Sequence, residues 1–328
     1  MKSSIIVTGG AGYIGSHTVV ELFLLGYKPI IIDNLCNSSK RNINGINKIL
    51  NTKIPFYNVD CNDYEKMKNI FNDNNVKACI HFAAFKSVNE SIIHPKKYFE
   101  NNIGSLKVLL KCIENCQYKN LIFSSSCTVY GMPNILPVNE NAPFKKPESP
   151  YAESKQLCEE IIKKNMCNSV SLRYFNPIGS HDSGLIGDCS RDVAANLVPI
   201  VAEVAAGLRK ELIVNGDDYN THDGTCVRDY IHVKDLALAH VKALDYLLSK
   251  PKKYIFNVGT GKGLSVLDVV SIFEKVNNVK VNYKIGPRRK GDIEKIYSDG
   301  KLISNTLSWK PVETVEDALK SSWKWQQK

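Results

Sequence analysis

A tyrosine and a lysine four residues apart form a candidate chemical unit in this sequence of 328 residues. They stand in the run Pro150-Tyr151-Ala152-Glu153-Ser154-Lys155, directly after Ser149. Serine supplies a capping oxygen and proline fits the first helical turn, so the run predicts a helix that begins there. On one face of that helix, the Lys155 ammonium would lower the pKa of the Tyr151 phenol, so that the phenol could take a proton near neutral pH. A packed tyrosine beside a solvated lysine is the alternative interpretation.

A glycine-rich turn near the N-terminus predicts a dinucleotide site. The strand pattern from Ser4 to Val7 leads into Thr8-Gly9-Gly10-Ala11-Gly12-Tyr13-Ile14-Gly15, and a helical pattern follows from Ser16 to Leu25. The three spaced glycines permit a tight turn and let the backbone approach a pyrophosphate, whose charge faces the helix amides. The strand, turn and helix context separates this motif from an ordinary glycine turn.

The acidic residue that ends the second predicted strand indicates which dinucleotide binds. Asp33 follows Pro29-Ile30-Ile31-Ile32 and lies downstream of the glycine turn. A carboxylate there can accept hydrogen bonds from both hydroxyls of the adenosine ribose and would repel a 2′-phosphate, which favours NAD over NADP. The nearby Lys40 and Arg41 keep NADP as an alternative.

Repeated strand and helix patterns predict an α/β fold with a Rossmann-like, doubly wound parallel sheet. A strand pattern near residues 55–59 ends in Asp60, and the run from Ala78 to Phe82 leads into Ala83-Ala84. Small residues at the carboxyl edge of a parallel strand let a cofactor lie against the backbone. His81 lies inside its strand, and we interpret it as a packed core residue and not as a base.

A serine cluster ends the strand that follows the long helical pattern from Pro95 to Cys116. The cluster reads Ser124-Ser125-Ser126-Cys127-Thr128-Val129-Tyr130-Gly131. Its hydroxyls could serve only a local turn. If the strand belongs to the sheet that presents the cofactor, the hydroxyl of Ser126 or Thr128 would face the same cleft as Tyr151. Serine, tyrosine and lysine would then surround one substrate oxygen.

Composition excludes several classes of protein. No apolar run approaches the roughly 18 residues that span a bilayer, and the N-terminus has too short an apolar core for a signal peptide, so we expect no membrane contact and a cytoplasmic protein. The 10 cysteines are scattered without a CxxC pair, which indicates reduced thiols. Nothing completes a metal site around Cys112 and Cys116, so we expect no metal. The net charge of +10 is spread without a lysine-rich block, which argues against nucleic acid as a partner.

Together these segments resemble the extended short-chain dehydrogenase/reductase superfamily, and within it the UDP-glucose 4-epimerase family. The resemblance covers nearly the whole chain. It is carried by the segments Thr8 to Thr18, Asp33 to Ser38, His81 to Ala83, Ser124 to Gly131, Ser149 to Lys155, Arg173 to Pro177 and Gly224 to Val233. The last two, RYFNP and GTCVRDYIHV, are much more specific to the family than the glycine turn.

The resemblance implies tightly held NAD and reversible 4-epimerisation of UDP-galactose and UDP-glucose. Residues 1–175 would form the NAD-binding domain, and residues 176–328 a smaller mixed α/β domain that binds the UDP-sugar, with segments around 225–250 returning to the first domain. In the implied reaction, Tyr151 takes the proton of the C4 hydroxyl while a hydride passes to the nicotinamide. The 4-keto sugar then turns over and takes the hydride back on its other face.

The resemblance also assigns roles to individual residues. It implies catalysis by Tyr151, Lys155 and Ser126. It implies NAD binding by Gly9, Gly12, Tyr13, Ile14, Gly15, Asp33, Asn34, Leu35, Cys36, Asn37, Ser38, Asp60, Cys61, Phe82, Ala83, Ala84, Lys86, Asn101, Ser126, Tyr151, Lys155, Tyr174 and Phe175. It implies substrate binding by Lys86, Ser126, Tyr151, Asn176, Asn196, Leu197, Ile213, Val214, Asn215, Arg228, Arg289 and Asp292. A homodimer built from the helices around residues 95–116 and 150–163 is implied as well.

The second half adds basic residues and two departures from the family pattern. Arg228, Arg289 and Lys290 could bind the oxygens of a nucleotide pyrophosphate, and a solvated charged surface is the alternative. Asn215 stands where the family usually has Phe, so one contact near the uracil would be lost. Ile296 is smaller than the Tyr that the family places there in members restricted to unacetylated sugars. UDP-N-acetylhexosamines are therefore an open second class of substrate.

Other functions within the superfamily stay open. A net NAD-dependent dehydrogenase, or an epimerase of other UDP-sugars, would use the same tyrosine and lysine. The related nucleotide-sugar 4,6-dehydratases carry an Asp-Glu pair where this chain has Cys127 and Thr128, so dehydration is not expected. A non-catalytic dinucleotide sensor on this fold generally lacks the tyrosine or the lysine, and both are present here.

Overall fold

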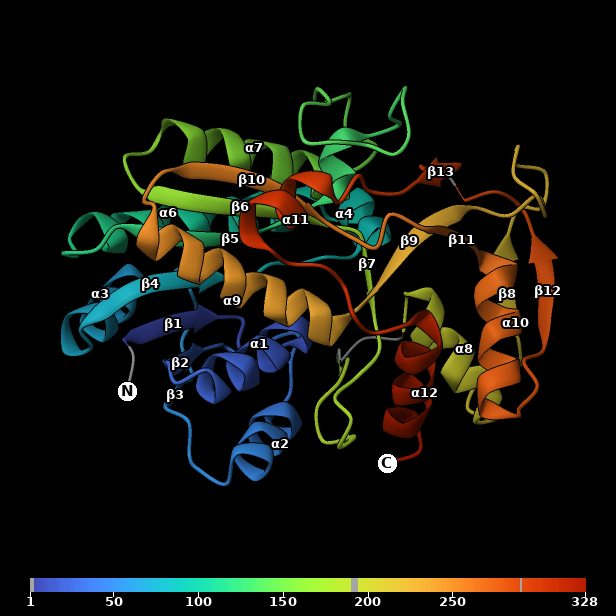
Figure 1. The fold of residues 1–328 in the computed structure, drawn as a ribbon, viewed down its shortest axis with the longest axis horizontal. Helices are drawn as coiled ribbons and strands as arrows, with labels where there is room; N and C mark the ends of the chain where they lie inside the picture. The colour runs from blue at the N-terminus through green and yellow to red at the C-terminus, as the bar shows by residue number, and fades with distance from the viewer. Residues whose placement is uncertain (1–2, 190–193, 290) are drawn as a thin grey trace.

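A seven-stranded sheet forms the centre of the computed structural model, which describes residues 3–189, 194–289 and 291–328 (Figure 1). The strand order is β10-β6-β5-β4-β1-β2-β3, and every neighbouring pair is parallel. The strands are β1 (Ser4–Thr8), β2 (Lys28–Ile32), β3 (Phe56–Tyr57), β4 (Val76–His81), β5 (Asn120–Ser126), β6 (Asn168–Tyr174) and β10 (Lys253–Val258). The order reverses beside β1, which is where ligands bind in open α/β sheets. The predicted doubly wound α/β fold is confirmed.

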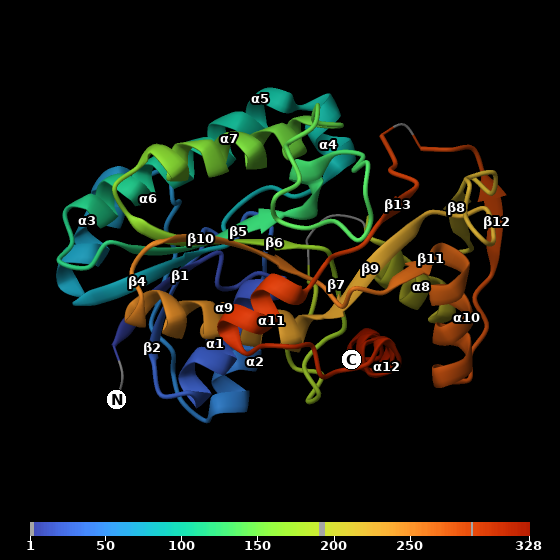
Figure 2. The ribbon, with the colours of Figure 1, turned by 45° about the horizontal axis from the view of Figure 1, so that its top comes forward.

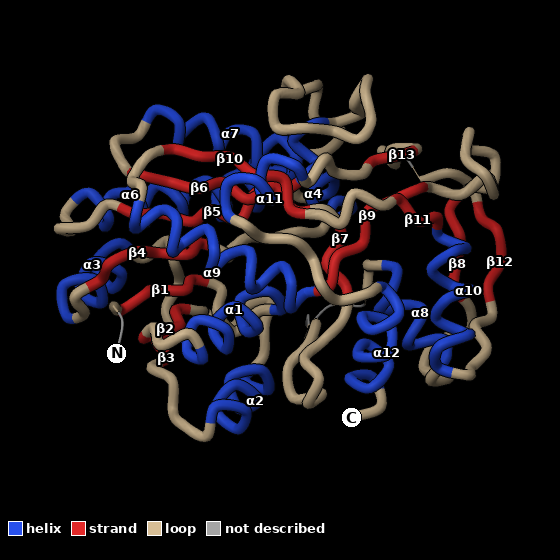
Figure 3. The backbone as a smooth tube through the Cα atoms, in the orientation of Figure 1, coloured by secondary structure: helices blue, strands red, loops and turns tan. Residues whose placement is uncertain are grey.

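Helices cover both faces of this sheet (Figures 2 and 3). One face carries α1 (Tyr13–Leu24), α2 (Lys40–Leu50) and α9 (Val233–Ser249), and the other carries α3 (Tyr64–Asp73), α6 (Gly104–Glu114) and α7 (Pro150–Lys164). Side chains alternate along β1, so that Ile5 and Val7 join one core and Ile6 joins the other. Burial on both faces explains why these strands read as continuous apolar runs.

The segment 95–116, predicted as one helix, consists of three helical pieces. They are α5 (Pro95–Tyr98), the π-helical turn η1 (Phe99–Ile103) and α6. The buried Asn102 lies in the π turn, and its side chain accepts from the amide of Phe85 at 2.9 Å and donates to the carbonyl of Phe85 at 3.1 Å. The π turn thus fixes the loop after β4. Hydrophobic spacing could not reveal it, because the backbone stays helical throughout.

The second half packs beside the carboxyl ends of the large sheet (Figure 1). It contains β7 (Asn176–Ile178), α8 (Leu197–Ala205), β8 (Leu212–Asn215), β9 (Val227–His232), β11 (Gly263–Ser265), α10 (Val266–Asn277), β12 (Tyr283–Gly286), β13 (Lys295–Ile296) and α12 (Val315–Gln326). The sheet around β9 is mixed, because β7 and β13 pair with β9 in parallel and β11 pairs antiparallel. After β9 the chain returns to the large sheet as α9 and β10. In the described part of the chain, no helix has both the length and the apolar character needed to cross a bilayer.

Three buried histidines make the stability of the fold depend on pH. His81 is buried and hydrogen-bonded to Thr8 at 2.7 Å, which confirms that it is a core residue. Burial lowers the pKa of His17 and His81 to about 3 and that of His240 to about 4.

We therefore expect acid to destabilise the protein well before its carboxylates titrate. The unfolded chain binds protons at these histidines near pH 6.5, whereas the folded chain resists protonation until about pH 3 to 4. Stability is then complete above about pH 6.5 and falls by up to about 1.4 kcal/mol per pH unit for each histidine below it. Urea unfolding at pH 7.5, 6.5 and 5.5 measures this fall. Equal free energies of unfolding at pH 7.5 and 5.5 would contradict the prediction.

Candidate active site

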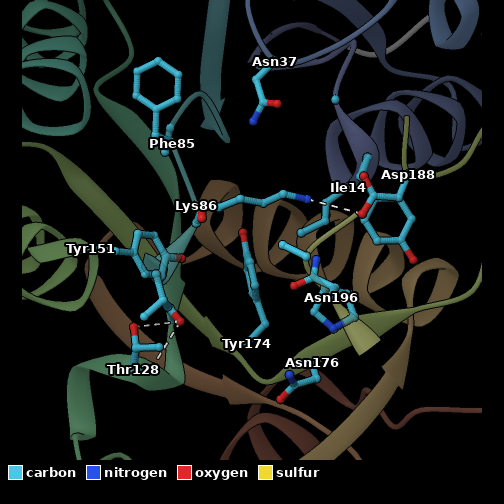
Figure 4. Close-up of a pocket in the computed structure, with 18 of the residues that line it drawn as sticks. Ile14, Asn37, Phe85, Lys86, Thr128, Tyr151, Tyr174, Asn176, Asp188 and Asn196 are labelled. Carbon is cyan, nitrogen blue, oxygen red and sulfur yellow. Dashed lines mark hydrogen bonds and ion pairs between the residues drawn. The ribbon is translucent and has the colours of Figure 1, made fainter. Parts of the chain in front are cut away.

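A cavity of about 500 Å³ lies at the carboxyl ends of β1, β4 and β5 and is closed on its other side by the second half of the chain. Figure 4 shows side chains from both halves facing this space, including Tyr151, Tyr174, Asn176 and Asn196. Among the residues that the structure describes, every site residue named from the sequence lines the cavity except Leu35. Its volume lies in the range of cofactor and substrate pockets.

The glycine turn brings bare backbone to the edge of the cavity. A Cβ atom on Gly9 would lie 2.7 Å from the amide nitrogen of Ala83, and one on Gly15 would lie 2.3 Å from the carbonyl oxygen of Gly9. The N-cap residue of α1 is Gly12, which offers no side-chain cap to the amides of the first turn. A dinucleotide pyrophosphate requires a backbone that it can approach closely and helix amides that are free to bind its charge. This turn offers both, so it fits NAD.

Asp33 is held rigidly at the end of β2. Its carboxylate accepts from the Ala11 amide at 3.0 Å, the Leu35 amide at 2.9 Å and the Ser38 hydroxyl at 2.8 Å. Burial raises the pKa of Asp33, and these hydrogen bonds oppose that shift. Leu35 itself has a left-handed backbone with φ of 59°, which turns its side chain into a buried cluster with Ala11 and Ile43. The Leu35 side chain therefore does not face the cofactor site, and the residue contributes there only through its amide, which orients Asp33.

The basic residues that kept NADP as an alternative point elsewhere. The Arg41 guanidinium stacks on the ring of Trp325 at 3.8 Å, and Lys40 is exposed. Neither residue lines the cavity. A 2′-phosphate would therefore meet the Asp33 carboxylate without a cation from this pair, which favours NAD.

Helix α7 presents the tyrosine and the lysine as predicted from their spacing. The Ser149 hydroxyl accepts from the Ala152 amide at 3.2 Å, so serine caps the helix and Pro150 occupies its first turn. Both Tyr151 and Lys155 line the cavity, and the Lys155 Nζ lies 5.9 Å from the centre of the Tyr151 ring. Lys155 donates to the carbonyl of Ser124 at 2.7 Å.

Ser126 faces Tyr151 from the end of β5. Its hydroxyl oxygen accepts from the Thr128 amide at 3.2 Å and from the Thr128 hydroxyl at 3.0 Å. Because these bonds occupy the oxygen, the Ser126 proton is directed away from them, and a hydrogen bond to Ser126 lowers the pKa of Tyr151. Of the two candidate hydroxyls, Ser126 is the one that lowers the pKa of Tyr151, and Thr128 orients Ser126.

The proton affinities in this group differ from the expectation. Burial raises the pKa of Tyr151 to about 12, although the hydrogen bond from Ser126 lowers it in part. Burial also lowers the pKa of Lys155 to about 8. The predicted lowering of the tyrosine pKa by lysine is not found, because the ammonium is aimed at the Ser124 carbonyl and desolvation dominates both groups.

Polar groups in the middle of the cavity include some that sequence reasoning missed. The buried Tyr174 hydroxyl points into the cavity without a well-formed hydrogen bond to the described residues, and burial raises its pKa (Figure 4). The Lys86 Nζ reaches across to the Asp188 carboxylate at 3.4 Å. Asp188 lies in an irregular segment, so no strand or helix pattern could place it here. Phe85 and Cys189 were also missed and line the same space.

The second half contributes a charged group at the other end of the cavity. Asp292 accepts from Arg289 at 2.6 Å and lies 3.8 Å from a nitrogen of Arg228. Two guanidinium groups beside a single carboxylate leave donors for a phosphate. Lys290 lies outside the described residues. Ile296 is buried against Cys127 and also lines the cavity, so its side chain limits the available space.

Comparison with known proteins gives consistent matches over the whole chain. The profile of the GDP-mannose 4,6 dehydratase family matches residues 6–322. The chain is 44% identical to the UDP-glucose 4-epimerase of Pasteurella multocida over 99% of this chain and 98% of that protein. The UDP-glucose-4-epimerase from Stenotrophomonas maltophila, solved with bound NAD and formylated UDP-arabinopyranose, superposes with a TM-score of 0.96 at 42% identity, covering 99% and 98%. The UDP-Glc/GlcNAc 4-epimerase of Campylobacter jejuni superposes with a TM-score of 0.84 at 36% identity, covering 99% of each chain.

Proposed function

The chain belongs to the UDP-glucose 4-epimerases, within the broader family named after GDP-mannose 4,6 dehydratase, and we propose from this premise how its own residues carry out the reaction. It is an isomerase that interconverts UDP-galactose and UDP-glucose through a 4-keto intermediate with NAD as cofactor. The observation that carries the assignment is the convergence of Ser126, Tyr151 and Lys155 on the cavity that also contains the glycine turn.

Each catalytic residue has a separate role in the proposed reaction. NAD⁺, which Gly9, Gly12, Gly15 and Asp33 would hold, would supply a positively charged ring that accepts a hydride and, once reduced, gives it back. Tyr151 takes the proton of the C4 hydroxyl and later returns it, while Ser126 orients the phenol and the sugar oxygen. Lys155 and the positive charge of the bound nicotinamide ring would together favour the phenolate, because burial alone leaves the pKa of Tyr151 at about 12. Gly12 and Gly15 let the backbone approach the cofactor pyrophosphate.

The second half of the chain holds the nucleotide and leaves the hexose free to turn. Arg228 and Arg289 bind the UDP pyrophosphate, and Asn196 lies at the start of α8 on the same side of the cavity. A site that grips one end of the substrate firmly lets the 4-keto sugar rotate about its bonds to the pyrophosphate. This freedom is what allows the hydride to return to the opposite face.

A product assay without added NAD tests the proposal against a net dehydrogenase. The purified protein is incubated with UDP-galactose, and we expect UDP-glucose to appear with no steady accumulation of NADH. NADH formed in proportion to the sugar consumed would indicate a dehydrogenase. A dehydratase would form a 4-keto-6-deoxy product, which the absence of an Asp-Glu pair at Cys127 and Thr128 argues against.

The space beside Ile296 supports UDP-N-acetylhexosamines as additional substrates. The Ile296 side chain lines the cavity at the position whose bulk, by the resemblance to the family, would meet the C2 substituent of the sugar, and one similar structure is a UDP-Glc/GlcNAc epimerase. In Ile296→Tyr we expect kcat/KM for UDP-N-acetylgalactosamine to fall by about tenfold or more, since filling a binding pocket costs about 1–3 kcal/mol. The value for UDP-galactose, measured on the same variant, should change by about threefold or less and serves as the control. An equal loss with both sugars would refute the gating role.

The remaining assignments are proposals about organisation. We propose the division into an NAD-binding and a UDP-sugar-binding domain, a homodimer built from the helices around residues 95–116 (α5, η1 and α6) and 150–163 (α7), a cytoplasmic location and a role in galactose metabolism. All ten cysteines are free thiols, which supports a reducing compartment. Gel filtration at several protein concentrations tests the dimer.

A further inference from the structure

A buried polar cluster lies behind the candidate active site and does not line the cavity. Glu159 on α7 forms two hydrogen bonds with Arg173 on β6, at 2.9 and 2.6 Å, and accepts from the Ser125 hydroxyl at 2.5 Å. Arg173 also donates to the Tyr130 hydroxyl at 2.9 Å, and Tyr130 donates to Asn257 at 2.6 Å. All five side chains are buried, and we call them the Glu159 cluster.

The Glu159 cluster joins β6 to the two elements that carry the proposed catalytic groups, which are α7 and β5. Glu159 follows Lys155 by one helical turn, and the two side chains bind neighbouring residues of β5. Lys155 binds the Ser124 carbonyl, and Glu159 binds the Ser125 hydroxyl. Arg173 is the register partner of Ser125 in the sheet, directly before Tyr174. The helix is thus fixed against the strand at two adjacent points.

Stability alone gives a weak reason for this arrangement. A buried ion pair gains little over well-packed apolar side chains, because both charges must be desolvated. The placement of α7 along β5 gives a stronger reason for the cluster. A shift of the helix by one turn would move Tyr151 by about 5.4 Å relative to β5. Glu159 also opposes the effect of burial by raising the pKa of Lys155.

We propose that Glu159 and Arg173 are positioning residues for the proton transfer, which act through Ser125 to hold α7 in register with β5. Tyr151 and Lys155 then stay aligned with Ser126. This inference rests on the proposed epimerase function. The ionisable groups that face Glu159 and Arg173 are Lys155 and Cys158 on α7, Tyr130 in η2 (Cys127–Tyr130) and Glu140 on the segment that follows.

Two variants test the proposal, and each removes a different part of the cluster. Ser125→Ala removes only the contact with the strand. Glu159→Leu combined with Arg173→Met removes both charges while keeping apolar volume, a replacement that proteins with buried ion pairs often tolerate. In both variants we expect kcat with UDP-galactose to fall by about tenfold or more, because small misplacements of reacting groups are costly. KM and bound NAD should stay near the wild-type values.

A pH profile and a control separate positioning from loss of stability. In the double variant the alkaline limb of kcat should move to lower pH, because the carboxylate that raises the pKa of Lys155 is gone. Ser180→Ala removes another buried serine hydroxyl, which donates to the Ser321 carbonyl at 2.6 Å away from the cavity, and it should leave kcat unchanged. Wild-type kcat in Ser125→Ala overturns the proposal, even if the double variant fails to fold. Inactivity of the wild-type chain would instead refute the epimerase function.

Discussion

Replacing Tyr151 with phenylalanine is expected to lower kcat for UDP-galactose by about a hundredfold or more, the usual scale for a proton-transfer group. In the proposed mechanism the phenolate oxygen of Tyr151 accepts the C4 proton, and phenylalanine has no atom that can do so. Its ring packs edge-on against Tyr98 with 6.5 Å between centres, and phenylalanine keeps that packing. The fold and the cofactor should therefore be retained, and the loss should lie in kcat.

Initial rates of UDP-glucose formation measure the loss, and bound NAD per chain, released by denaturation, confirms that the site is intact. Tyr98→Phe is the matched control, since it removes a phenol that donates to Glu90 at 2.7 Å and does not line the cavity. Its kcat should stay within about threefold of wild type, because the Tyr98 hydroxyl does not reach the cavity where the proton is transferred. Turnover by Tyr151→Phe at the wild-type rate would remove the phenol from the mechanism.

The parts of this site that could be predicted from sequence are those fixed by local spacing. The cap at Ser149 and the four-residue interval from Tyr151 to Lys155 determine one helix face, and the structure has both on that face. The glycine turn is similar, because strand, turn and helix follow one another without a gap. In such cases the same local interactions that form the helix or turn also determine the direction in which its side chains point.

Features that depend on distant segments could not be predicted in this way. Asp188 reaches Lys86 only because its segment is held from two sides, by Asn42 on α2 through Gly187 and by Trp325 on α12, which donates to the Asp188 carbonyl at 3.0 Å. None of these pairings leaves a periodic signal. The raised pKa of Tyr151 escaped prediction for a related reason, because desolvation depends on the whole surrounding fold.

Substituting valine for Gly15 is expected to reduce bound NAD by at least about tenfold and to remove activity measured without added NAD. A Cβ atom there would lie 2.3 Å from the Gly9 carbonyl oxygen and 2.9 Å from the Gly10 Cα, so the turn must open and α1 must withdraw from it. Overpacking of this kind costs about 1–3 kcal/mol and falls on the backbone that would face the pyrophosphate. Gly300→Ala is the control, because its nearest neighbour is 4.0 Å away and its φ of −81° suits any residue. The melting temperature of Gly15→Val verifies that the variant is folded. If this folded variant still binds NAD at the wild-type level, close approach of the backbone at this turn is not what holds the cofactor.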